Sequence, residues 1–140
     1  MWAAAEDELR RDLERVHKHA GPFDFVLAAG DLVQNGTRAE LDLLTERLDG
    51  LFRHLGSLGS RPALLVVPGN HDLAHPDPRS PAVRPLLHWS HDPELRGNLF
   101  WHDTNGQPYR DVVGGAFDEL SRWTRAWNEA HPLPPSWSRS

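Results

Sequence analysis

The sequence has no cysteine among its 140 residues. This absence excludes disulfide bonds, a thiolate zinc site and a cysteine nucleophile. Any metal ion would therefore have to be held by Asp, Glu, Asn or His, and the chain contains nine histidines.

Long apolar runs and an excess of positive charge are also missing. No stretch approaches the roughly 18 consecutive apolar residues that a membrane span requires. The opening Met-Trp-Ala-Ala-Ala-Glu-Asp-Glu lacks the basic and apolar segments of a signal peptide. The sequence therefore predicts a cytoplasmic protein with no membrane partner. The net charge of -5 argues against binding nucleic acid through bulk basicity, although bound divalent cations could still reverse the charge locally.

Two amphipathic helices are predicted in the first half of the chain. Apolar residues recur at helical spacing over residues 4–20, and Gly21-Pro22 ends this helix. Thr37 and Glu40 then form a Thr-x-x-Glu capping box, which typically opens a helix. The apolar stripe of this second helix consists of Leu41, Leu44, Leu48, Leu51 or Phe52, and Leu55.

Two short apolar runs, 23–29 and 63–67, are predicted to be strands buried on both faces. The order helix, strand, helix, strand indicates an α/β fold with parallel strands and crossover helices. The carboxyl ends of parallel strands meet at the edge where open α/β sheets place their ligands. We therefore expect Asp31 to lie beside the Asn70-His71-Asp72 cluster.

The second half of the chain is less regular. Prolines interrupt it after Asp72, and a short helix is predicted within 83–91. A further helix is predicted over about 115–129, where Phe117, Leu120, Trp123 and Trp127 recur at helical spacing. Aromatic side chains at this spacing pack in a core more often than they stack on a nucleobase.

Two glycine-led motifs, Gly30-Asp31 and Gly69-Asn70-His71-Asp72, follow the two predicted strands. A carboxylate such as Asp31 can bridge two divalent cations, and the amide oxygen of Asn70 is a neutral, hard metal ligand. An imidazole beside metals, here His71, can protonate a leaving group. Asp72 is expected to orient the His71 ring.

This arrangement, with Asn35-Gly36 closing the first loop, resembles the second and third motifs of the calcineurin-like metallophosphoesterases over residues 20–75. The resemblance implies that Asp31 bridges two divalent metal ions (Mn, Fe or Zn), that Asn70 binds the second ion and that His71 serves the leaving group. Asp72 matches the acidic residue that closes the third motif. The resemblance further implies a partial metallophosphoesterase sandwich that hydrolyses a phosphate mono- or diester.

The chain also departs from the family pattern. Gln34 stands where many members have Asp, and neither the family's opening Asp-x-His nor its closing Gly-His-x-His has a match. We therefore expect a truncated member, with a core fragment over 1–75 and a Pro- and Trp-rich insertion or peripheral helical segment of the same domain over 76–140. The isolated chain is expected to be inactive until a further protein segment or partner completes the site.

These residues are also compatible with a second class of function, and they argue against a third. A non-catalytic remnant or interaction module stays open, because only Asp31 and Asn70 are predicted as direct metal ligands. A dinucleotide-binding unit is excluded, because no Gly-x-Gly-x-x-Gly follows either strand.

Overall fold

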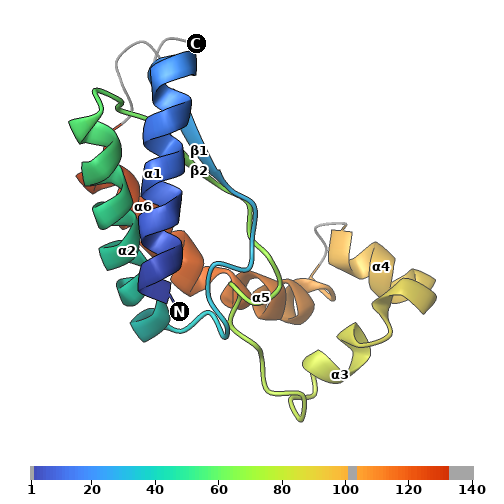
Figure 1. Cartoon of the computed structure of the whole chain (residues 1–140). Helices are drawn as coiled ribbons and strands as arrows, with labels where there is room; N and C mark the ends of the chain where they lie inside the picture. Colours follow the sequence, from blue (N-terminus) through green and yellow to red (C-terminus); the bar gives the residue numbers. More distant parts are fainter. Residues whose placement is uncertain (1, 101–103, 133–140) are drawn as a thin grey trace.

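A computed structural model describes residues 2–100 and 104–132 (Figure 1). The predicted α/β class and the parallel pairing of the strands are confirmed. Along these residues the elements are α1 (Trp2–Ala20), β1 (Phe25–Ala28), α2 (Arg38–Ser57), β2 (Ala63–Val66), α3 (Val83–Leu86), the 3-10 helix η1 (Trp89–His91), α4 (Pro93–Phe100), α5 (Gln107–Ala116) and α6 (Asp118–Ala130).

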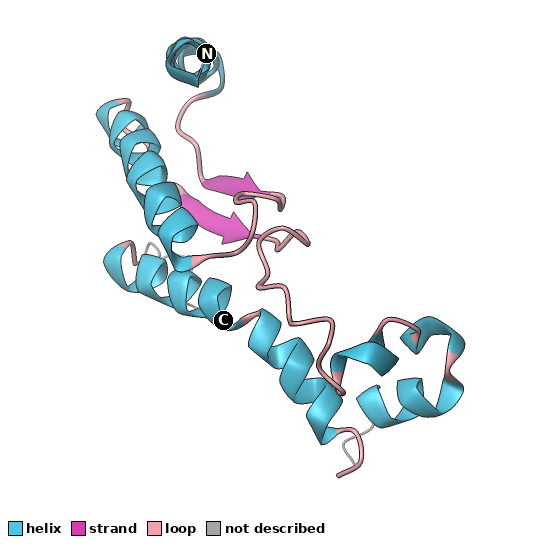
Figure 2. Cartoon of the chain, turned by 90° about the horizontal axis from the view of Figure 1, so that it is seen from below, coloured by secondary structure: helices cyan, strands magenta, loops and turns pink. Residues whose placement is uncertain are grey.

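The two strands pair in register, with Phe25 opposite Ala63 and Leu27 opposite Leu65. Successive side chains of a strand point to opposite faces of the sheet. One face carries Ala28 and Leu64, which are buried in a core formed with α2 and α6. The strands therefore rest on these two helices, as Figure 2 shows.

Apart from the buried Ala63, the other face of the sheet is exposed, so the prediction that both faces are buried is wrong. Phe25 is 53% exposed, Leu27 is 56% exposed and Leu65 is 42% exposed. An apolar run indicates that both faces are suited to burial, but it does not supply the element that would cover the second face.

Helix α6 is a central part of the core. Leu120, Trp123 and Trp127 are all buried, which confirms that these aromatics pack. The Trp123 indole Nε1–H donates to Thr45 Oγ1 of α2 at 2.8 Å, so the buried indole has its hydrogen-bond partner. Part of the segment predicted to be peripheral thus packs against both strands and α2. The division of the chain into a core fragment over 1–75 and a second segment over 76–140 stays a prediction.

The other helices of the second half extend away from the sheet (Figures 1 and 2). The helix expected within 83–91 is split into α3 and η1, and α4 and α5 were not predicted. Asp92 Oδ1 accepts from Leu95 N at 2.9 Å and so caps α4, whose first residue is Pro93. An aspartate followed by a proline is typical of a helix start, so the sequence Asp92-Pro93 could have predicted where α4 begins.

The capping box of α2 forms as predicted. Glu40 N donates to Thr37 Oγ1 at 3.3 Å, and Thr37 N donates back to the Glu40 carboxylate at 3.1 Å. Hydrogen bonds from Thr37, and then from Asn35, hold the pKa of Glu40 below its ordinary value. The start of α2 is thereby tied to the loop that precedes it.

Among the described residues, no helix is long and apolar enough to cross a bilayer.

Neighbouring leucines of β2 test how the sheet is covered. Leu64 is 8% exposed and Leu65 is 42% exposed. We expect Leu64→Ala to lower the free energy of unfolding by about 2–4 kcal/mol, and Leu65→Ala to lower it by less than about 1 kcal/mol. Urea denaturation of the two variants measures both values. Equal losses would mean that a further layer covers the exposed face.

Candidate active site

The loops that follow β1 and β2 are pressed together at the carboxyl edge of the sheet. Gly30 has a φ of +94°, and a Cβ built there would lie 2.8 Å from Gly69 N. A Cβ at Gly69 would in turn overlap the backbone nitrogen and the carboxylate of Asp31. Both positions therefore need glycine, because any side chain would force the two loops apart.

The Asp72 carboxylate joins the same two loops. Its Oδ1 accepts hydrogen bonds from Leu32 N at 2.6 Å and from Val33 N at 3.0 Å, and its Oδ2 accepts from Gly69 N at 2.8 Å. The side chain is only 1% exposed. A buried carboxylate needs such donors, and bonds to a charged acceptor are stronger than bonds between neutral groups.

The expected role of Asp72 is therefore wrong in one respect. It was predicted to orient the His71 ring, but both of its oxygens face backbone N–H groups of the two loops. The carboxylate shapes the loops that carry the other site residues.

Asp31 lies exposed at the edge of the sheet, in an unusual backbone conformation. Its φ is +54°, and among the described residues it is the one non-glycine residue with a positive φ. Asp tolerates this left-handed region better than most residues, yet the conformation still costs energy and is often found at functional sites. Asp31 Oδ1 accepts from His71 N at 3.2 Å, so the two motifs meet as expected.

Gln34 holds the His71 ring. The ring Nδ1 lies 3.1 Å from the backbone oxygen of Gln34 and 3.3 Å from its side-chain Nε2. A protonated Nδ1 donates to the carbonyl oxygen, and an unprotonated Nδ1 accepts from the amide. In both cases the other ring nitrogen, Nε2, is left for a different partner. This role of Gln34 was not predicted, although the residue lies in the same loop as Asp31 and so close to the candidate site.

The donor atoms at this edge fit a divalent metal ion by type. Asp31 offers a carboxylate and the exposed Asn70 offers an amide oxygen, both hard ligands suited to such ions. Their number is small. Within residues 2–100 and 104–132, no three His, Cys, Asp or Glu side chains lie close enough to hold a metal ion together. The described residues thus offer two donors of a type that suits a metal ion, and no larger group of ligands.

Comparison with known proteins gives one match. The family model described as calcineurin-like phosphoesterase matches residues 5–138. No curated protein and no solved structure matches the chain.

The Asp72 clamp can be tested with an isosteric change. Asp72→Asn sets an NH₂ donor against backbone N–H groups, so at least one hydrogen bond is replaced by an unfavourable contact. We expect a loss of about 1–3 kcal/mol in unfolding free energy. We also expect faster amide hydrogen exchange at Leu32 or Gly69. Asp7→Asn, at an exposed position of α1, is the matched control and should change neither measurement.

Gly36 tests the close approach of the loops. Its φ is +60°, and an added Cβ would lie 2.6 Å from the carbonyl carbon of Leu73. Gly59 also has a positive φ, but a Cβ there meets nothing within 4 Å. Gly59→Ala should lower the free energy of unfolding by about 1 kcal/mol, from backbone strain alone. Gly36→Ala should lower it by about 2–4 kcal/mol, because the added methyl group also meets the opposite loop. Similar losses in urea denaturation would show that the loops can separate without penalty.

Proposed function

Because the chain belongs to the calcineurin-like phosphoesterase family, we propose that its two glycine-bounded loops form part of a metal-dependent site that hydrolyses a phosphate mono- or diester. Phosphoester hydrolysis with bound divalent metals is the chemistry of this family. The observation that carries the proposal is the meeting of Asp31 with His71, at 3.2 Å, beside the exposed Asn70.

Asp31 and Asn70 are the proposed metal ligands. One Asp31 oxygen accepts from His71 N, which fixes the carboxylate and leaves its second oxygen available. Two divalent ions, Mn, Fe or Zn, would use these donors together with ligands from a further protein segment or partner. When bound, such ions stabilise the negative charge that develops on the phosphoryl oxygens.

His71 is proposed to act on the leaving group. With Nδ1 held by Gln34, the ring can present a proton at Nε2. Transfer of this proton to the departing oxygen, as its bond to phosphorus breaks, yields an alcohol rather than an alkoxide. Asp72 is proposed to position both loops and to have no contact with the substrate.

A non-catalytic interaction module is the second candidate. It is favoured by the small number of ligands, since Asp31 and Asn70 alone do not complete a metal's coordination shell. The two candidates differ in metal affinity, which the module does not require. A cytoplasmic location stays a prediction under both.

Substitutions at Asp31 and His71 should fail in different ways. We expect Asp31→Asn to lower manganese affinity, because the change removes the negative charge of a proposed ligand. In a form of the protein whose ligand set is complete, His71→Ala should retain its metal and lose about 10²–10⁴ in rate on an alkyl phosphate ester. The loss should be smaller on an aryl ester, whose leaving group needs no proton. Metal content measured beside both rates gives the result.

Asp77→Asn serves as the control for charge in this experiment and should change neither metal affinity nor rate. Manganese binding that is unaffected by Asp31→Asn would favour the interaction module. Loss of metal from His71→Ala, or equal slowing of both esters, would contradict the role given to His71.

A further inference from the structure

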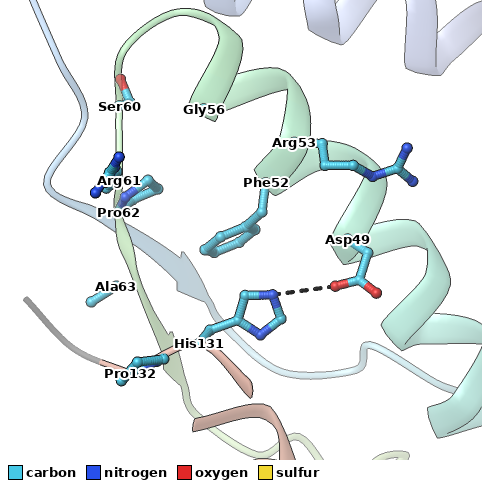
Figure 3. A pocket seen from close by; sticks show the side chains of 10 residues that line it. All are labelled: Asp49, Phe52, Arg53, Gly56, Ser60, Arg61, Pro62, Ala63, His131 and Pro132. Carbon is cyan, nitrogen blue, oxygen red and sulfur yellow. Dashed lines mark ion pairs between the residues drawn. The ribbon is translucent and has the colours of Figure 1, made fainter. Parts of the chain in front are cut away.

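A cavity of about 810 Å³ lies at the amino end of β2, away from the loops that carry Asp31 and Asn70. It is bounded by the second half of α2, by the chain entering β2 and by the residues that follow α6 (Figure 3). Its volume is in the range of sites that hold small organic molecules.

The walls of this cavity are apolar and aromatic. Phe52, Pro62, Ala63 and Pro132 line it together with the imidazole of His131. The His131 ring stacks on Trp127 with ring centroids 4.0 Å apart, and Phe52 contacts Trp127 edge-on at 5.2 Å. Because the buried Trp127 holds both rings, the aromatic walls are already in place for a flat ligand.

The charges around the cavity favour an anion. The acidic side chain of the lining, Asp49, lies 3.3 Å from His131 Nε2 and is thus partnered. Arg61 stands at the edge beside Pro62, and Arg53 extends outward from α2 (Figure 3). Neither arginine has an acidic partner among the described residues. The whole chain has a net charge of -5, so any attraction for an anion here is local.

We propose that this cavity binds a small amphipathic anion built on a flat aromatic ring, such as an aryl carboxylate or sulfonate. The ring lies against Phe52 and His131, and the acid group pairs with Arg61. A guanidinium is well suited to this role, because it donates two parallel hydrogen bonds to a planar or tetrahedral anion. The proposal is independent of the chemistry assigned to Asp31 and His71.

The test uses naphthalene-2-sulfonate as the probe, followed by amide chemical shifts in the full chain. We expect saturable shifts at Phe52, Ala63 and His131. Arg61→Glu should weaken binding by about tenfold or more, as the loss of a charged hydrogen-bond partner implies. Arg96→Glu, on the distant α4, makes the same change in net charge and should leave affinity within about twofold.

A blocking variant separates this cavity from other apolar surfaces. Gly56 borders the cavity, and a Cβ built there meets nothing within 4 Å. Gly56→Leu should therefore fold normally, fill the mouth of the cavity and abolish probe binding. Gly114→Leu is the matched control, because Gly114 also lies in a helix with open space around it. Binding should persist in that variant.

Several results would overturn the proposal. Unchanged affinity in Gly56→Leu, or shifts centred on Phe25 and Leu27, would place the probe on the exposed sheet face. Equal binding of the neutral naphthalene-2-sulfonamide would remove the role of Arg61. A wild-type dimer that excludes the probe, with Gly56→Leu monomeric in sedimentation, would make a second copy of the chain the occupant.

Discussion

The contact on which the site depends is the one between the Asp72 carboxylate and three backbone N–H groups. Leu32 and Val33 belong to the loop after β1, and Gly69 belongs to the loop after β2. One buried side chain therefore fixes the distance between two chain segments that each carry a candidate functional residue. The bond from His71 N to Asp31 forms only while the loops are held this close, and the surrounding contacts offset the cost of the left-handed backbone at Asp31.

Much of the fold could be predicted because helix and strand periodicities are local properties of the sequence. The parallel strands, the capping box of α2 and the packing of Trp123 and Trp127 all follow from such patterns. The exposure of Phe25 and Leu27 does not, because it depends on what lies beside the sheet. Helix α5 was missed because it contains the paired glycines Gly114 and Gly115, which local propensity counts against a helix.

The site residues could be named from their motifs, but their contacts could not. The sequence order of Asn70, His71 and Asp72 leaves open which way each side chain points. In the structure, Asp72 turns into the protein and His71 turns toward Gln34. Gln34 offers the imidazole a side-chain N–H donor beside its backbone acceptor, whereas a carboxylate at this position would offer acceptors alone. The roles of Asp31 and Asn70 in binding metal remain predictions.

The glycine contacts between the loops also limit how this protein can change over evolutionary time. Gly30, Gly36 and Gly69 each face backbone of the opposite loop, with no space for even a methyl group. An insertion or a larger residue in one loop would need a simultaneous adjustment in the other, so single mutations there meet a fitness barrier. Helices α3 and α4 extend away from the sheet (Figure 1), and they can vary in length and composition without crossing it. Sequence and length changes in related proteins should therefore be more frequent in α3 and α4 than in the two loops.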